Sequence, residues 1–267
     1  MATTIKDIYQ YIDSLAPFET QMDFDNAGLL VGRECAYVDK VLVSLDITTP
    51  VIREAVNIGA QLIVAHHPVI FNPIKKVSDT DMTGEKVLML AENRIGAICA
   101  HTNLDAAQGG VNELLAKRLG LTGLEHLHMD GEDREGRTYG IGRVGTWNAN
   151  IPLTAKDFAE KVKQDLNAAG VRYVDAGKPV CRVAVGGGSC GSMLRDAVAA
   201  GCDTFVTADV KYDVFLSAME QGINLLDAGH FATEDIVMRP LADLLQTAFP
   251  QVTVTKSTVH KEVFASI

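Results

Sequence analysis

The sequence predicts an α/β protein made of two related α/β domains, each a mostly parallel sheet flanked by helices. Short apolar runs with strand character alternate with amphipathic stretches of helical periodicity, which is the pattern of βαβ units. Part of this pattern also occurs twice along the chain. The chain has 267 residues, a length that suits one or two domains.

In the first half, helix and strand signals follow one another in order. A stripe of apolar residues predicts a helix over 4–15, and the turn-rich segment 23–32 runs into a short strand. Residues 41–46 have strand character, while threonine caps, a proline and Gly59 mark a helix over 48–60. The remaining predictions are a strand over 61–67, a helix over 84–93 and a strand over 97–101.

The second half repeats this plan. When segment 41–67 is aligned with segment 183–209, the two share charged, glycine and apolar positions. Further on, a histidine followed four positions later by a carboxylate occurs once in each half, in the same order relative to the aligned segments. The members of this second match are His101 and Asp105 in the first copy and His230 and Glu234 in the second. Several matches in one order indicate an internal duplication.

The duplication predicts two domains that are joined along the chain by the charged, glycine-containing stretch around 126–140. We expect the first domain over 1–125 and the second over 126–267, with a C-terminus able to pack back on the first. Similar units commonly pack about a pseudo-two-fold axis. Equivalent strand ends would then face one interdomain cleft.

Composition and charge exclude several classes of protein. The net charge is −10 and the pI near 5.1, with no Lys/Arg cluster, which argues against nucleic-acid binding through phosphate neutralisation. The N-terminus lacks the apolar core of a signal peptide, and no apolar run is long enough for a membrane span. The cysteines are odd in number, widely spaced and mostly in apolar context, so we expect reduced core cysteines in a cytoplasmic protein. They are Cys35, Cys99, Cys181, Cys190 and Cys202.

His66 and His67 end the apolar run QLIVA and are the most informative pair in the chain. Neighbouring side chains of a strand face opposite ways, so both imidazoles reach one place only if the strand has just ended. On open α/β sheets, metal and active sites lie beyond such strand ends.

Six residues that follow predicted strands form a candidate metal centre. They are His66, His67, His101, Asp105, His230 and Glu234. Imidazole and carboxylate donors together suit Zn, Mn, Fe or Ni. One ion needs three or four protein ligands, so five or six ligands indicate two ions. A two-metal centre activates water and stabilises an oxyanion, which is typical of hydrolases.

Seven segments, in order over nearly the whole chain, form a specific combination of motifs. They are FDNAGLLVG (24–32), SLDIT (44–48), EAVNIGAQLIVAHHPVIF (54–71), HTNLDAAQGGVN (101–112), GGGSC (186–190), TADVKYD (207–213) and DAGHFATE (227–234). Together they resemble the Nif-three-like dinuclear metal-centre family, whose members are named as homologues of GTP cyclohydrolase one type two.

The resemblance implies two related α/β domains assembled as a homohexameric toroid, with two divalent ions in the interdomain cleft of each subunit. The ligands it implies are His66, His67, Asp105, His230 and Glu234, with Glu234 suited to bridge the ions. His101 matches a common histidine of the family, and its implied role is support of a ligand or proton transfer.

The chain departs from the family pattern in two places. Longer members carry a domain inserted between the halves, for which 267 residues leave no room. A regulatory role of that insert is therefore not carried over. Many members also have a histidine after the tyrosine of the TGDxKY-like segment, whereas here Asp213 follows Tyr212. A role of that position in substrate handling is not carried over either.

Three weaker features leave two interpretations open. Gly186–Ser189 lies between a strand and a helix, where it forms either a tight turn or a phosphate-binding loop. Asn26 is either a turn residue or part of the cleft lining. Lys75 and Lys76 are either solvated loop charges or a basic lip for a phosphorylated substrate.

The sequence therefore predicts a dinuclear-metal-dependent hydrolase that acts on a small phosphorylated or nucleotide-like molecule through a metal-activated water. GTP ring opening rests on the family name alone. The alternative is a metal-binding regulatory or scaffold toroid without enzymatic activity, since the same residues can bind a structural or a catalytic metal.

Overall fold

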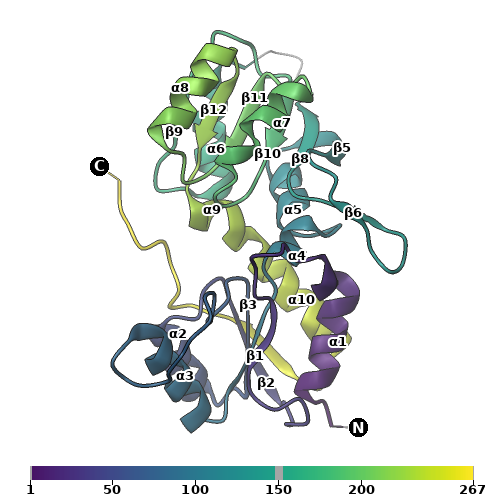
Figure 1. Cartoon of the computed structure of the whole chain (residues 1–267), viewed down its shortest axis with the longest axis vertical. Coiled ribbons are helices and arrows are strands. Elements are labelled where there is room, and N and C mark those ends of the chain that lie inside the picture. The colour runs from purple at the N-terminus through teal and green to yellow at the C-terminus, as the bar shows by residue number, and fades with distance from the viewer. Residues whose placement is uncertain (1, 148–152, 267) are drawn as a thin grey trace. The chain divides into compact units, whose positions relative to one another are not determined.

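The computed structural model describes residues 2–147 and 153–266 (Figure 1). The chain forms two compact units. The first unit comprises the chain up to Leu104 together with Val237–Lys261, and the second comprises Asp105–Ile236 and the chain from Glu262 onward. The predicted boundary lies at 125/126 instead. The difference arises because helix α5 (Val111–Arg118) and strand β5 (Leu121–His126) pack on strand β8 (Arg143–Trp147) of the second unit.

The first unit is built on a five-stranded sheet in the order β1-β4-β3-β2-β13. Its strands are β1 (Gly28–Val31), β2 (Lys40–Ser44), β3 (Leu62–Ala65), β4 (Gly96–Cys99) and β13 (Thr253–Lys256). Strand β1 is antiparallel to β4, and the other three pairings are parallel. The prediction of a mostly parallel sheet is confirmed for this unit, and β13 near the C-terminus extends the sheet beside β2.

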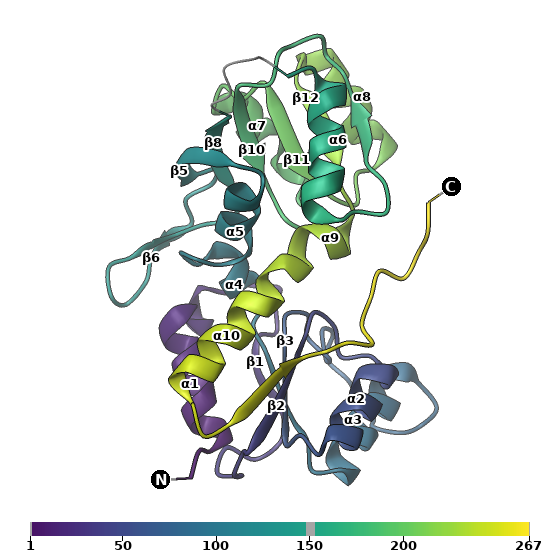
Figure 2. The same cartoon turned by 180° about the vertical axis from the view of Figure 1, so that it is seen from behind.

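Helices cover both faces of this sheet. Helices α2 (Thr49–Ile58) and α3 (Met82–Glu92) lie on one face, and α1 (Ile5–Leu15) and α10 (Met238–Ala248) lie on the other (Figures 1 and 2). Helix α1 approaches so closely that a Cβ at Gly96 would lie 2.5 Å from Ile5 Cδ1. The predicted helix starts are also confirmed, since Thr4 and Thr48 cap α1 and α2.

The second unit is built on a six-stranded sheet in the order β5-β8-β10-β11-β12-β9. The strands not yet located are β9 (Arg172–Val174), β10 (Arg182–Val185), β11 (Thr204–Thr207) and β12 (Asn224–Asp227). Only the pairings β10–β11 and β11–β12 are parallel, while three pairings are antiparallel. The prediction of a mostly parallel sheet is therefore wrong for this unit. The antiparallel strands β8 and β9 flank a short parallel centre, β8 beside β10 and β9 beside β12.

Alternate residues of the central strands of this sheet face two apolar cores. Val183 and Val185 pack with α5 and α6 (Ala155–Leu166), whereas Ala184 packs with α7 (Leu194–Ala199) and α8 (Tyr212–Gln221). This alternation is the two-residue period of a strand buried on both faces. Short elements complete the unit, namely the pair β6 (Gly131–Glu132) and β7 (Thr138–Tyr139), the turns η2 (Gly191–Met193) and η3 (Asp235–Val237), and helix α9 (His230–Glu234).

The repeated sequence pattern corresponds to repeated elements. In the alignment of segment 41–67 with segment 183–209, strand β3 coincides with β11 end for end. Each unit thus contains three parallel strands with helices between them, β2-β3-β4 in the first and β10-β11-β12 in the second. The origin of this similarity in a gene duplication stays a prediction.

The remaining short elements of the first unit are η1 (Phe18–Thr20) and the N-terminal turn of α4 (Thr102–Ala106), whose sequence runs on into the second unit. Among the described residues, no helix combines the length and the apolar character that crossing a lipid bilayer requires.

Candidate metal centre

His66 and His67 follow the last residue of β3 in the first unit. Their backbone amides both donate to the carbonyl of Leu45, at 3.2 and 2.9 Å, so the regular alternation of the strand has ended. The two rings accordingly lie on one side, with centroids 5.0 Å apart and planes inclined at 45°. His66 is completely buried. The expectation that a strand end would gather both imidazoles is confirmed.

His101 joins this pair from the end of the neighbouring strand β4. Its ring centroid lies 5.1 Å from that of His66 and 5.5 Å from that of His67. One ring nitrogen of each histidine lies within 4.8 Å of the others. The first unit thus brings three predicted site residues together, and His101 is placed as favourably for binding a cation as the other two.

Each of these imidazoles is held through its Nδ1 atom. His66 Nδ1 lies 2.7 Å from the Ala100 carbonyl oxygen, His67 Nδ1 lies 2.9 Å from Asp46 Oδ1, and His101 Nδ1 lies 2.7 Å from Asp25 Oδ1. A carbonyl or carboxylate oxygen only accepts, so each Nδ1 carries the proton. The lone pair of the neutral ring is then on Nε2, which is the arrangement of a metal-bound histidine.

Asp25 is a buried carboxylate that the motif FDNAG places beside His101. It accepts from His101 Nδ1 and from both the amide (3.0 Å) and the hydroxyl (2.5 Å) of Thr102. Burial raises the pKa of Asp25, but the hydrogen bonds from His101 and Thr102 together outweigh it and lower the pKa to about 2. Asp25 therefore stays ionised and fixes the orientation of His101.

Asn26, next in the same motif, fixes its loop. Its side-chain amide donates to the Ile70 carbonyl at 2.6 Å, and its backbone amide donates to Asp25 Oδ1 at 2.7 Å. The structure thus favours the interpretation of Asn26 as a turn residue.

Asp46 supports His67 from the residue pair that follows β2. Its second oxygen accepts from His260 Nε2 at 2.8 Å, so one carboxylate joins two imidazoles. Burial raises the pKa of Asp46, but the hydrogen bonds from His260 and His67 outweigh it and hold the pKa well below its usual range. The carboxylate is therefore ionised.

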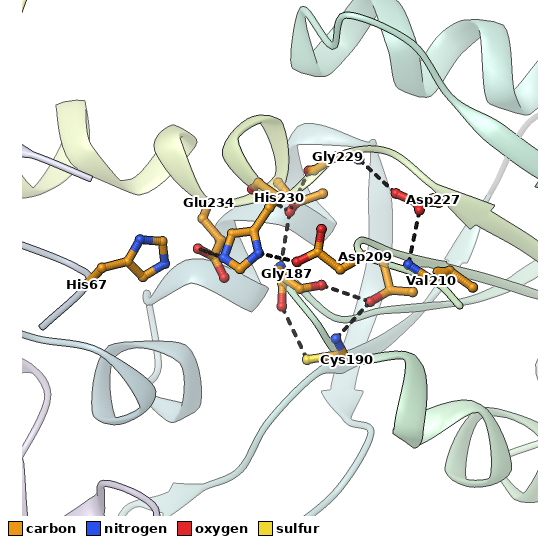
Figure 3. A network of polar contacts seen from close by, with 12 residues as sticks. His67, Gly187, Cys190, Asp209, Val210, Asp227, Gly229, His230 and Glu234 are labelled. Atoms are coloured by element: carbon orange, nitrogen blue, oxygen red, sulfur yellow. Dashed lines mark hydrogen bonds and ion pairs between the residues drawn. The ribbon is translucent and has the colours of Figure 1, made fainter. Parts of the chain in front are cut away.

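His230 and Glu234 stand at the two ends of the short helix α9 in the second unit (Figure 3). His230 Nε2 lies 3.0 Å from Glu234 Oε2, and His230 Nδ1 lies 2.7 Å from Asp209 Oδ2. The orientation of His230 thus follows the rule seen for the other histidines. Asp209 adopts a φ of +52°, an uncommon conformation for a residue with a side chain, which places its carboxylate against the ring.

Asp227 fixes the two loops that carry Asp209 and His230 (Figure 3). Its buried carboxylate accepts from the amides of Val210 (3.0 Å) and Gly229 (3.2 Å) and from the guanidinium of Arg172. Both loops are therefore tied to the end of β12.

Asp105 lies beside Glu234 in the second unit. The two residues are 8 % and 3 % exposed, and a carboxylate oxygen of each lies within 4.8 Å of the other. Two carboxylates this close and this buried repel each other unless a proton or a cation lies near both. The second unit thus brings the remaining three predicted residues together as one imidazole and two carboxylates.

The glycine turn Gly186–Ser189 serves to make room for Glu234. A Cβ at Gly188, where φ is +61°, would lie 2.1 Å from Glu234 Oε1 and 3.2 Å from His230 Nε2. The amides of Gly187 and Gly188 donate to Asn112 Oδ1 (2.8 Å) and Thr233 Oγ1 (3.1 Å). Because the protein itself uses these amides, the structure favours the tight turn over the phosphate-binding loop.

The remaining predicted positions lie outside the two clusters of site residues. Lys75, Lys76 and Tyr212 are exposed, which agrees with solvated loop charges for the lysines. All five cysteines are free, but the prediction that they lie in the core is wrong for Cys35 and Cys181, which are exposed. Burial, together with the charges of Asp105 and Glu234, raises the pKa of the Cys190 thiol, which therefore stays protonated and donates to the Gly187 carbonyl.

Four supporting residues were missed at the level of sequence. They are Asp25, Asp46, Asp209 and His260. Asp46 and Asp209 each follow a strand by two residues, and this position was a usable signal. His260 carried none, because it lies in a tail with no periodic pattern.

The donor set fits a divalent transition metal. Imidazole nitrogens with fixed tautomers and buried carboxylates are the ligands that Zn, Mn, Fe and Ni share. The fold and these residues together define a two-unit α/β protein with histidine and carboxylate clusters typical of metal-binding proteins.

The comparisons with known proteins identify the family. The model of the Duf34/NIF3 (NGG1p interacting factor 3) family matches residues 3–263, so the chain belongs to this family. The chain is 33 % identical to the GTP cyclohydrolase 1 type 2 homolog of Clostridium acetobutylicum over 235 residues, which cover 88 % of this chain and 86 % of that one.

Solved structures of relatives have the same fold. A hypothetical protein from Staphylococcus aureus is 30 % identical and superposes with a TM-score of 0.91, with all of both chains covered. A Bacillus cereus protein related to NIF3 is 26 % identical and also reaches a TM-score of 0.91, covering 100 % of this chain and 99 % of that one.

Proposed function

We propose that this protein is a hydrolase that binds two divalent metal ions and acts on a small phosphorylated or nucleotide-like substrate. The proposed ligands are His66 and His67 of the first unit and Asp105, His230 and Glu234 of the second. Glu234 would help to hold both ions, because a carboxylate has two oxygens to donate.

The fixed tautomers of the histidines are the observation that carries this proposal. In His66, the Nδ1 proton is committed to the Ala100 carbonyl, and in His67 it is committed to Asp46. The basic lone pair is therefore on Nε2 before any ion binds. A histidine that only filled a core would have no need of a carboxylate on its rear nitrogen.

The chemistry divides between the ions and the chain. Bound divalent ions would lower the pKa of a water molecule to near neutrality and stabilise the charge that develops on the substrate. His101, held by Asp25, is the residue we assign to proton transfer, since its Nε2 can accept a proton while the aspartate stabilises the resulting imidazolium. Asp105 and Glu234 supply the negative charge that retains the cations.

The name of the Clostridium relative suggests GTP as one substrate to test, but a two-metal centre is generic for hydrolysis and does not specify the bond.

We also propose that the chain assembles as a homohexamer. Light scattering of the purified protein, with a mass near six times that of the 28.7 kDa chain, would support this assembly.

The proposed activity is tested by a screen of metals against substrates. Zn²⁺, Mn²⁺, Fe²⁺ and Ni²⁺ are each combined with phosphomonoesters, phosphodiesters and nucleotides including GTP, and His67→Ala serves as the blank. We expect hydrolysis that requires one of these ions and is lost in the variant. Equal hydrolysis by the variant would contradict the proposal. Firm metal binding without turnover of any substrate would favour the metal-binding regulatory or scaffold protein.

A further inference from the structure

A segment near the C-terminus reaches the predicted ligand His67 through one carboxylate. His260 donates from Nε2 to Asp46 Oδ2 at 2.8 Å, and Asp46 Oδ1 lies 2.9 Å from His67 Nδ1. The His260 side chain is 7 % exposed. Both oxygens of the carboxylate are thus used by imidazoles, and all three residues belong to the first unit.

The sheet brings this segment to the right place. Strand β13 runs parallel to β2, with Lys256 opposite Val43, so the two strands end at the same edge of the sheet. Asp46 follows β2 at that edge, and residues 257–260 follow β13. The last contact of the ladder is the Ser257 amide, which donates to the Val43 carbonyl at 2.7 Å.

Glu54 on α2 fixes the same segment independently. Its carboxylate accepts from the Ser257 hydroxyl (2.5 Å), the Thr258 amide (2.9 Å) and the Thr258 hydroxyl (2.7 Å). The Ser257 hydroxyl also accepts from the His260 amide at 3.3 Å. With its backbone held in this way, His260 has little freedom except to face Asp46.

We propose that His260 is a positioning residue for the metal centre, acting on His67 through Asp46. By occupying one oxygen of Asp46, His260 fixes the plane of the carboxylate, and the other oxygen then fixes the tautomer and the ring orientation of His67. This inference rests on the proposed role of His67 as a ligand. It assigns a function to the C-terminal segment, which the predicted ligand set does not include.

The test measures the affinity of the whole protein for Zn²⁺ by competition with a chromophoric chelator. His260→Leu removes the donor and keeps a side chain of similar bulk, and we expect affinity to fall about tenfold, as is usual when a hydrogen bond behind a ligand is lost. His260→Gln keeps an N–H donor near the position of Nε2, and we expect it to restore affinity to within about threefold of the wild type.

The matched control is Thr258→Val in the same segment. Thr258→Val removes the hydroxyl contact to Glu54 but keeps the contacts of the Thr258 amide and the Ser257 hydroxyl that hold the segment. Zn²⁺ affinity should therefore be unchanged even if the melting temperature falls. Melting of the metal-free proteins separates folding from positioning. If His260→Leu fails to fold, His260→Met makes the same test with a more adaptable side chain.

The outcomes separate this inference from the proposed function. If the wild type binds Zn²⁺ and His260→Leu binds it equally well, the positioning role is wrong while the metal centre stands. Equal weakening by the leucine and glutamine variants also overturns it, because a donor would then make no difference. A wild-type protein that binds no divalent ion overturns both.

Discussion

The two units share a pattern of strands and helices, but they use equivalent positions for different purposes. When segment 41–67 is aligned with segment 183–209, Asp46 and His67 of the first unit fall opposite Gly188 and Asp209 of the second. In the first unit, the aspartate supports the histidine. In the second, Asp209 stands at the histidine position and supports His230, while the glycine stands at the aspartate position and makes room for Glu234.

This exchange shows how one scaffold supplies two kinds of donor. The first unit offers three imidazoles at the ends of two neighbouring strands, whereas the second offers one imidazole and two buried carboxylates. In both units, the Nδ1 atom of each of these histidines is hydrogen-bonded to an oxygen, which fixes the orientation of the ring.

Gly188→Ala should cause the largest loss. The new Cβ would lie 2.1 Å from Glu234 Oε1, in a backbone conformation with φ +61°. Because Glu234 is buried and has little room to retreat, we expect a loss of about 3 kcal/mol of unfolding free energy together with loss of bound metal. Urea unfolding and metal analysis measure the two effects.

Gly201→Ala is the control for backbone strain alone. Gly201 has a similar φ of +72°, but a Cβ there would have no neighbour within 4 Å. We expect a cost of about 1 kcal/mol and no change in bound metal. Equal effects of the two substitutions would show that the glycine turn makes no special room for Glu234.

Asp209→Ala should weaken metal binding about tenfold, because His230 loses the oxygen that fixes its Nδ1 proton. Asp209→Asn keeps an oxygen acceptor and tolerates the left-handed conformation, so it should bind metal within about threefold of the wild type. Competition with a chelator measures both. If Asp209→Ala and Asp209→Asn weaken metal binding equally, an oxygen acceptor at His230 Nδ1 is not what supports metal binding in the second unit.

The lowered pKa of Asp25 makes the unfolding free energy of the protein fall with pH in the acid range. Its pKa is lowered from 3.8 to about 2 in the folded protein, so its contribution to stability is complete above the usual value and is lost as the pH falls towards about 2. In metal-free protein, the unfolding free energy of Asp25→Asn should therefore decline less steeply between about pH 4 and pH 2 than that of the wild type. Parallel declines in urea titrations would show that Asp25 is not specially stabilised.

Cys190→Ala should have the smallest effect. Among the described residues, Cys190 belongs to none of the groups whose donor atoms lie close enough to hold an ion, so it is not expected to act as a ligand. Loss of its bond to the Gly187 carbonyl should cost about 1 kcal/mol at most, with bound metal unchanged. A clear drop in metal content, measured beside the wild type, would place Cys190 in the centre after all.

The sequence predicted the strands and the residues at their ends better than the hydrogen bonds that orient those residues. Strand β3 was located because its unbroken apolar run is a strong signal, and His66 and His67 followed from its end. Its counterpart β11 was placed by the alignment of the two halves. The antiparallel strands β8 and β9 were missed because pairing direction depends on connections distant in sequence. Asp46 and His260, which are far apart along the chain, meet only through the pairing of β13 with β2.

The boundary between the two units could also not be predicted from the sequence. Residues 105–125 lie in the second unit because α5 and β5 complete the core and the sheet there. The repeat marks only the segments that resemble each other, so it does not show with which unit the connecting segment packs.

The proposal that His67 of the first unit and His230 of the second both bind divalent ions is decided by metal stoichiometry. Metal analysis is applied to the wild type and to His67→Ala and His230→Ala, which remove one imidazole from each unit. We predict two divalent ions per chain in the wild type and a loss of bound metal in both variants. A full complement of metal after either substitution, or a wild type without divalent ions, would contradict the account.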